Sequence, residues 1–247
     1  MNLLLAESTE VVEGRLVVTD RRADHLVKVL HVARGDTVRV GIVDGPQGVG
    51  VVEAVTAAFP RSVSLCLTLH PCRAQRPAID LIVALARPIM MRRIFSQAAA
   101  LGVGALYCIQ ARRVEKSFWE ATLFEQKGYG EHLRQGLEQA MDTRLPEVHF
   151  YRRFKPFVED VLPAVAKGYD RCILAHPAGR RTLVQALAGT RGRVLVAVGP
   201  EGGWIDYEVE RFHAAGLVSC TMGERILKVD TAVVALHARI SQIIETG

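Results

Sequence analysis

Residues 194–204 read VLVAVGPEGGW, an apolar run that ends in a glycine-rich turn. An uninterrupted apolar run is typical of a strand in a parallel sheet that helices cover on both faces. Asp206 is a suitable N-cap for a following helix, with Glu208 and Glu210 in its first turns. A strand, a glycine turn and a helix in this order indicate an open α/β sheet. Its ligand is expected beyond the carboxyl ends of the strands.

The region around this stretch alternates apolar runs with amphipathic segments. Met90, Ile94 and Ala98 share one helical face in one such segment, and Val233 and Leu236 do so near the end of the chain. This rhythm predicts a mostly parallel α/β sheet. The predicted strands are Ile79–Leu85, Ala105–Ile109, Glu147–Tyr151, Arg171–Ala175, Arg193–Val198 and Val218–Met222.

Residues 1–70 have a different pattern, in which short β-type segments are separated by Gly, Asp and Pro. One helix interrupts them, with Asp20 as its predicted cap and with Leu26, Val29 and Leu30 on one face. The pattern predicts a small β-barrel with one inserted helix. The predicted strands are Arg15–Thr19, Thr37–Val43, Gly48–Thr56 and Ser62–Thr68.

Residues 71–77 read PCRAQRP and break both patterns with two prolines and two arginines. Such a stretch is typical of a linker. We therefore predict a barrel domain over 1–70, a linker over 71–77 and an α/β domain over 78–247.

Composition excludes several classes of protein. The 247 residues are 49% hydrophobic and 23% charged, which is typical of a globular protein. No uncharged apolar run is long enough to span a membrane, and the N-terminus lacks the pattern of a signal peptide. The five cysteines form no C-x-x-C pair and the eight histidines are scattered, so we expect a cytoplasmic protein without a metal. The cysteines are Cys66, Cys72, Cys108, Cys172 and Cys220.

The net charge of +5 favours a polyanionic partner, and basic residues occur in local clusters. The alternative interpretation of each cluster is solvated surface charge. Our candidates for contact with a phosphate backbone are Arg21, Arg22, Lys28, Arg92, Arg93, Arg112 and Arg113.

A second unusual loop lies at residues 222–232, which read MGERILKVDTA. It leaves a predicted strand and enters the terminal helix, with Asp230 or Thr231 as the expected cap. Ile226 and Leu227 are apolar within a charged loop. They are expected either to pack against the protein or to form walls for a flat aromatic ligand.

The segments 198–203 (VGPEGG) and 222–232 together closely resemble the signature of the RsmE family. These are SPOUT-class methyltransferases of N3 of a uridine in small-subunit ribosomal RNA. The resemblance includes residues 25–30 (HLVKVL), 100–103 (ALGV) and 138–140 (EQA), and it extends over essentially the whole chain. It implies a PUA-like barrel that grips RNA. It also implies a homodimeric α/β domain with a C-terminal trefoil knot.

The resemblance implies that S-adenosylmethionine lies in the knot between three loops. It assigns the cofactor to Leu174, Ala175, His176, Gly199, Pro200, Glu201, Gly202, Met222, Gly223, Ile226 and Leu227. Arg225 is the first candidate for a cation that favours the anionic form of uracil, and a structural ion pair with Glu201 or Asp230 is its alternative role. Glu201 is expected to orient its loop or to contact the base. Lys228 is expected to bind phosphate or to cap the knot.

Several residues depart from the family pattern. The last motif usually reads Gly-Pro-Arg-Ile-Leu-Arg-Thr-Glu-Thr, whereas this chain has Glu224, Lys228, Val229 and Asp230 in place of a proline, an arginine, a threonine and a glutamate. Two alternatives therefore stay open. One is a related SPOUT activity, such as ribose 2′-O methylation or methylation of another base position. The other is a non-catalytic RNA-binding factor of ribosome assembly.

Overall fold

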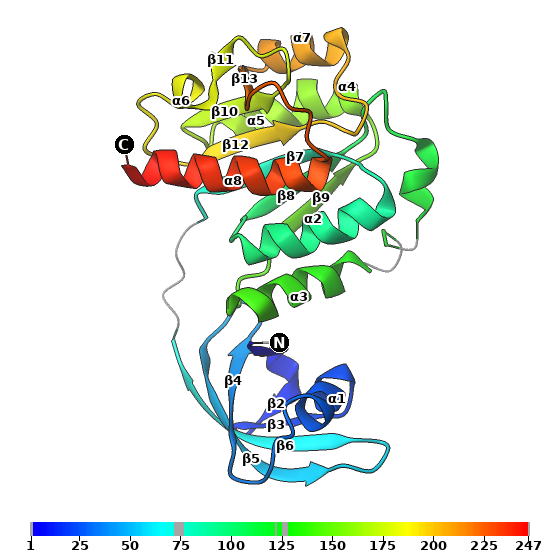
Figure 1. The fold of residues 1–247 in the computed structure, drawn as a ribbon, viewed down its shortest axis with the longest axis vertical. Helices are drawn as coiled ribbons and strands as arrows, with labels where there is room; N and C mark the ends of the chain where they lie inside the picture. Colours follow the sequence, from blue (N-terminus) through cyan, green and yellow to red (C-terminus); the bar gives the residue numbers. More distant parts are fainter. Residues whose placement is uncertain (1, 72–76, 122, 125–127, 247) are drawn as a thin grey trace. The chain divides into compact units, whose positions relative to one another are not determined.

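The computed structural model describes residues 2–71, 77–121, 123–124 and 128–246. The chain forms two compact units, which are traced in Figure 1. Unit 1 comprises Met1–Gln75 and Arg134–Leu145, and unit 2 comprises Arg76–Leu133 and Pro146–Gly247. Residues 72–76 of the predicted linker, including Cys72, lie outside the described residues.

Unit 1 is built on a six-stranded sheet with the order β1-β4-β5-β6-β3-β2. Strand β1 runs parallel to β4, and the other neighbours are antiparallel. The four predicted strands are confirmed. The sequence pattern missed β1 and β2, which are too short to show a period. The strands are β1 (Leu4–Ala6), β2 (Val11–Val12), β3 (Arg15–Val18), β4 (Thr37–Ile42), β5 (Gln47–Thr56) and β6 (Ser62–His70).

Helix α1 (Arg21–Lys28) lies among these strands, after the short 3-10 helix η1 (Ser8–Glu10). The predicted cap is confirmed, because the Asp20 side chain accepts a hydrogen bond from the Arg22 N–H. The predicted apolar face is wrong beyond Leu26. The helix ends at Lys28, and Val29 and Leu30 are 60% and 48% exposed. Leu26 packs instead in a core with residues such as Leu16 and Leu65 of the sheet.

A segment from the second half of the chain completes unit 1. We predicted that residues 134–145 belong to the α/β domain, and the structure places them in unit 1 instead. The Glu138 carbonyl accepts hydrogen bonds from the Asn2 and Leu3 N–H groups, and the Thr143 hydroxyl donates to the Gly45 carbonyl. The bond of Thr143 joins residues 98 positions apart, and the bonds to Glu138 join residues still farther apart in the sequence. No periodic pattern within residues 134–145 predicts these hydrogen bonds.

Unit 2 contains a seven-stranded sheet in which every neighbouring pair is parallel, with the order β11-β13-β10-β12-β7-β8-β9. All six predicted strands are confirmed, and the two-residue strand β11 was not predicted. The strands are β7 (Ile79–Ala84), β8 (Ala105–Ile109), β9 (Glu147–Tyr151), β10 (Arg171–Ala175), β11 (Arg181–Thr182), β12 (Val194–Val198) and β13 (Val218–Thr221).

Helices cover this sheet, and α2 and α8 lie side by side, with α8 against β12 and β7 (Figure 1). Helix α8 begins at Val229, slightly before the predicted cap. Helix α7 begins at Asp206, and the Glu208 side chain accepts from the N–H of the preceding Ile205. The helices of unit 2 are α2 (Pro88–Ala100), η2 (Lys116–Glu120), α4 (Phe154–Pro156), η4 (Phe157–Val161), α5 (Leu162–Ala166), α6 (Leu183–Ala186), α7 (Asp206–Ala214) and α8 (Val229–Thr246). Helix α3 (Tyr129–Ala140) begins in unit 2 and belongs to unit 1 from Arg134 onward.

The strand order determines where the loops of unit 2 converge. Strands β12 and β13 lie on either side of β10 and run parallel to it. The carboxyl ends of these three strands therefore meet at one edge of the sheet. The loops that follow Ala175, Val198 and Thr221 emerge there together, which is the edge where open α/β sheets bind ligands.

Candidate active site

Three loops enclose a cavity of about 230 Å³ at this edge of unit 2. All the residues predicted to hold a cofactor line it, except Leu174, which is fully buried at the end of β10. Glu201 and Arg225 line the cavity, and Lys228 does not. The predicted lining residues are Ala175, His176, Gly199, Pro200, Glu201, Gly202, Met222, Gly223, Ile226 and Leu227.

The first loop contributes the half-buried imidazole of His176. The His176 N–H donates to the Cys220 carbonyl, and Nδ1 accepts from the Ala178 N–H at 3.2 Å. Burial lowers the pKa of His176, and Asp206 opposes this shift. A neutral ring that accepts at Nδ1 carries its proton on Nε2. Burial also raises the pKa of the Cys220 thiol to about 11, which keeps it protonated.

The second loop, Gly199–Gly203, is closed by a hydrogen bond from the Gly203 N–H to the Pro200 carbonyl at 2.8 Å. Gly203 has a φ of +74°, which favours glycine. A Cβ atom at Gly199 would lie 3.1 Å from Nε1 of the Trp204 indole, so a larger residue would displace that ring. Trp204 is only 4% exposed and meets Phe212 edge to face. The Trp204 ring is therefore held by packing.

Residues that follow two neighbouring strands hold the second loop and the helix after it. The Glu201 carboxylate accepts from the Arg87 N–H at 3.0 Å, at the start of α2 after β7. The Arg113 guanidinium, after β8, donates to the Gly202 carbonyl. The buried Glu208 carboxylate accepts from the Arg112 N–H at 2.7 Å. Sequence reasoning missed all three contacts because their partners lie about one hundred residues away.

The third loop carries apolar side chains into the cavity wall. Ile226 and Leu227 are 75% and 37% exposed, so they do not pack into the protein interior. Of the two roles expected for them, the wall of a ligand site agrees with this exposure. The Arg239 guanidinium of α8 donates to the Met222 carbonyl at 3.2 Å and ties the start of the loop to the helix.

Arg225 lies in the cavity wall with an exposed side chain. Within the described part of the chain, its guanidinium makes no hydrogen bond or ion pair. The two carboxylates considered as its structural partners are engaged elsewhere. Glu201 binds the Arg87 N–H, and Asp230 pairs with Arg93 at 3.4 Å. The guanidinium is thus available to a ligand.

The structure divides the candidate RNA contacts into two groups. Four of them bind protein groups: Arg21 pairs with Glu138, Arg22 with Glu10 and Asp20, Arg93 with Asp230, and Arg113 binds the Gly202 carbonyl. Arg22 is also nearly buried, at 12% exposure of its side chain. Lys28 makes an exposed pair with Asp24, and no bond of the Arg92 or Arg112 side chain is found within the described residues.

Helix α8 supplies the floor of the cavity, which the sequence assignment missed. Val229, Ala232 and Leu236 line it. Their spacing of three and four residues places them on one helical face, and this periodicity was the available signal. The Tyr207 ring lies outside the cavity lining, 44% exposed, with the Arg211 guanidinium 5.6 Å from its centroid.

The described residues include no cluster of histidine, cysteine and acidic side chains arranged to bind a metal ion. No helix within the same residues has the length and apolar character needed to cross a bilayer.

Comparison with known proteins adds to this geometry. Residues 74–241 match the model of a family described as RNA methyltransferase domain. A ribosomal RNA small subunit methyltransferase E from Treponema pallidum is 29% identical over 96% of this chain and 90% of its own length. The protein of the same name from Bacillus subtilis is 23% identical over 91% of this chain and 88% of its own length.

The fold of the chain also matches solved structures. A ribosomal RNA small subunit methyltransferase E from Neisseria gonorrhoeae, bound to S-adenosylmethionine, superposes with a TM-score of 0.78 at 18% identity and covers 98% of both chains. A Legionella pneumophila protein in complex with the same cofactor gives a TM-score of 0.77 at 19% identity over 98% of this chain and 97% of that chain. The chain therefore belongs to the RNA methyltransferase domain family, and its resemblance to the RsmE proteins is confirmed over almost its whole length.

Proposed function

We propose that this protein transfers a methyl group from S-adenosylmethionine to N3 of a uridine in small-subunit ribosomal RNA. One observation carries the proposal. The three loops assigned to the cofactor, far apart in the sequence, surround a single cavity at the carboxyl edge of the parallel sheet. The relatives named as ribosomal RNA small subunit methyltransferase E support the choice of RNA.

The cavity suits a nucleoside joined to an amino acid. Its apolar lining includes Ile226, Leu227 and Leu236, which are suited to the faces of an adenine ring. The glycines of the second loop expose backbone N–H and carbonyl groups that can bind the polar edges of the ligand. S-Adenosylmethionine, when bound, supplies an electrophilic methyl group on a positively charged sulfur.

The target nitrogen must lose its proton to solvent water before it can attack. Arg225 is the residue that we assign to this step, because its guanidinium lies in the cavity wall and has no partner among the described residues. A cation held beside the uracil stabilises the anionic imide and lowers the cost of deprotonation. The second loop contributes by positioning, since it is anchored at both Glu201 and Gly202. We assign Glu201 to this anchoring and not to proton transfer.

RNA contacts are proposed for the basic side chains that remain available. These are Arg92 and Arg112 in unit 2, together with Lys28 in unit 1, whose pair with Asp24 is exposed and weak. Lys228 is adjacent to the cavity in sequence but does not line it, which suits a contact with phosphate. We assign Arg22 to the stabilisation of unit 1, through its ion pairs with Glu10 and Asp20.

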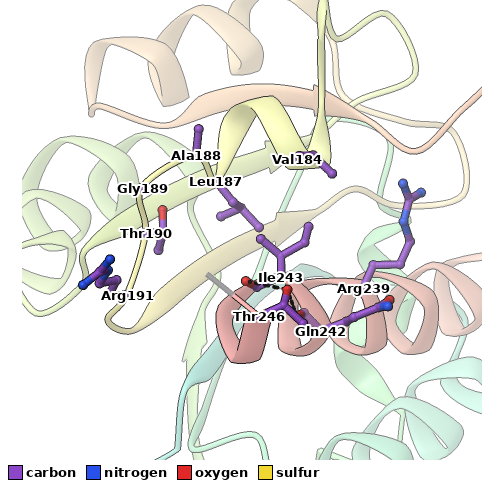
Figure 2. Close-up of a pocket in the computed structure, with 10 residues that line it drawn as sticks. All are labelled: Val184, Leu187, Ala188, Gly189, Thr190, Arg191, Arg239, Gln242, Ile243 and Thr246. Carbon is purple, nitrogen blue, oxygen red and sulfur yellow. Dashed lines mark hydrogen bonds between the residues drawn. The ribbon is translucent and has the colours of Figure 1, made fainter.

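The resemblance also implies a PUA-like barrel, a trefoil knot, a homodimer and a cytoplasmic location, and we include them in the proposal. The placement of β12 and β13 on either side of β10 supports a threaded C-terminal segment. Figure 2 shows a pocket of unit 2 between α6 and the end of α8, lined by both apolar and polar residues. Val184 and Ile243 line this pocket, which is a suitable surface for a second copy.

The test is methylation in vitro. The purified protein is incubated with labelled S-adenosylmethionine and small-subunit particles from cells that lack the endogenous enzyme. The labelled nucleoside is then identified by mass spectrometry. We expect 3-methyluridine. A 2′-O-methylated or other methylated nucleoside would assign the protein to a related activity. Absence of label in a protein that binds the cofactor and the particles would favour a non-catalytic assembly factor.

A further inference from the structure

We propose that Arg113 is a positioning residue that holds the second loop, Gly199–Gly203, in the shape that binds the cofactor. Sequence alone groups Arg113 with Arg112 as a contact for RNA. The structure shows that the two residues make different contacts. This inference rests on the proposed function for its cofactor, although the positioning itself is a property of the chain without any ligand.

The first argument is the contact between the guanidinium and the loop. The Arg113 Nη1 group donates a hydrogen bond to the Gly202 carbonyl. The stem of the side chain also lies against the glycine, since a Cβ atom at Gly202 would be 3.0 Å from Cδ and 3.2 Å from Cβ of Arg113. The contact therefore uses both the charge and the methylene groups of the side chain.

The second argument is what this contact does to the loop. A glycine-rich loop loses much conformational entropy when it becomes ordered, so its shape requires external restraints. The Gly203 N–H bonds to the Pro200 carbonyl and closes the turn from within. Glu201 and Arg113 restrain it from outside, through the loops that follow β7 and β8. Arg113 fixes the orientation of the Gly202–Gly203 peptide group, which lies in the cavity lining.

The neighbouring Arg112 provides a matched control. It carries the same charge one residue earlier, and its bond to Glu208 is made by the backbone N–H and not by the guanidinium. Arg112→Ala therefore removes one positive charge without releasing the second loop. Arg113→Ala removes the same charge together with the contact to Gly202.

The experiment compares the wild type, Arg112→Ala and Arg113→Ala in three measurements. Amide hydrogen exchange of residues 199–203 without ligand is expected to be faster only in Arg113→Ala. The dissociation constant for S-adenosylmethionine, measured by calorimetry, should rise roughly tenfold in Arg113→Ala, the effect of losing one charge-assisted hydrogen bond. In the methylation assay, the KM for the cofactor should rise by a similar factor, with a much smaller change in kcat.

The proposal is overturned if Arg113→Ala has the same amide exchange rates at residues 199–203 and the same affinity for the cofactor as Arg112→Ala, and loses only affinity for RNA. Failure of the proposed function is a separate result. If the wild type binds no S-adenosylmethionine, that function fails, whereas the exchange comparison without ligand still decides the role of Arg113.

Gly202→Ala provides a second and independent test of the same contact. The added methyl group would press on the Arg113 side chain and displace it, so the substitution is expected to weaken cofactor binding in the wild-type background. In the Arg113→Ala background the contact with Cδ at 3.0 Å is removed and only the contact with the retained Cβ at 3.2 Å remains, so the further loss should be smaller. Such non-additivity is the signature of residues in direct contact. Fully additive losses would contradict the packing of Arg113 on Gly202.

Discussion

The Glu201 carboxylate accepts a hydrogen bond from the backbone N–H of Arg87 across 114 positions of sequence, at a distance of 3.0 Å. Arg87 is the residue before Pro88, at the N-terminus of α2. The first N–H groups of a helix lack partners within the helix, and its dipole favours a negative charge there. The bond thus stabilises the start of α2 and fixes the second loop of the cavity at the same time.

This relationship predicts different effects for two substitutions of Glu201. Glu201→Gln keeps an acceptor for the Arg87 N–H, and we expect it to retain most of the methylation rate. Glu201→Ala loses the acceptor, and we expect the KM for S-adenosylmethionine to rise several-fold and the unfolding free energy to fall by about 1 kcal/mol. Steady-state kinetics and urea denaturation measure both. A fall in kcat of roughly 10²-fold or more for Glu201→Gln would instead identify a group that transfers a proton.

Arg225→Ala is expected to lower kcat by about 10²- to 10³-fold, because it removes the cation assigned to the anionic imide. The dissociation constant for the cofactor should stay close to that of the wild type, since the guanidinium makes no bond that shapes the described loops. Single-turnover methylation and calorimetry separate the two quantities. A near-normal methylation rate would remove Arg225 from the catalytic residues.

Arg92 and Arg93 are adjacent on α2 and are expected to behave differently. Arg93 pairs with Asp230 of α8, whose side chain is only 9% exposed, so Arg93→Ala leaves that carboxylate without its cation. We expect a lower melting temperature for Arg93→Ala and weaker RNA binding for Arg92→Ala. Thermal unfolding and an RNA binding titration at fixed salt test the pair. Equal losses of RNA affinity in both variants would argue that the ion pair opens when RNA binds.

Asp80 organises the amino edge of the same sheet, at the opposite end from the cavity. Its fully buried carboxylate accepts from the Ala105 N–H and the Tyr169 hydroxyl and pairs with Arg193. Asp80→Ala leaves several donors and a cation without partners, so we expect a loss of about 3–5 kcal/mol. Asp80→Asn retains an acceptor and should lose less. Denaturant unfolding measures both, and a loss below about 1 kcal/mol for Asp80→Ala would contradict the role assigned to this network.

Unit 1 is expected to lose stability in acid through Glu10. The hydrogen bond from the Arg22 side chain holds the pKa of Glu10 below its ordinary value of 4.5. A carboxyl group with a lowered pKa contributes stability that is present above the unfolded pKa and is lost as the pH falls through the folded one. Glu10→Gln should therefore be less stable than the wild type at pH 7, and the difference should shrink below about pH 4.5. A difference that stays constant from pH 7 to pH 3, measured by urea denaturation, would contradict this linkage.

Local sequence patterns were sufficient to predict much of the fold. Strand β12 follows from a continuous apolar run, and β7 from a run that is apolar apart from Asp80, because a strand covered on both faces needs apolar residues at nearly every position. The cap at Asp20 follows from an equally local rule. The strands β2 and β11, with two residues each, are too short to have a detectable period.

The sequence by itself determined the parallel sheet, the residues of the three loops and, through the combined motifs, the family. These depend on side chains that are close together along the chain. Only the tertiary structure decided which basic side chains bind protein groups and which can bind a ligand. Arg113 rests on Gly202, Arg93 pairs with Asp230, and residues 134–145 complete unit 1. The contact of Arg113 joins residues 89 positions apart and that of Arg93 joins residues 137 positions apart, so both depend on the packing of the whole chain.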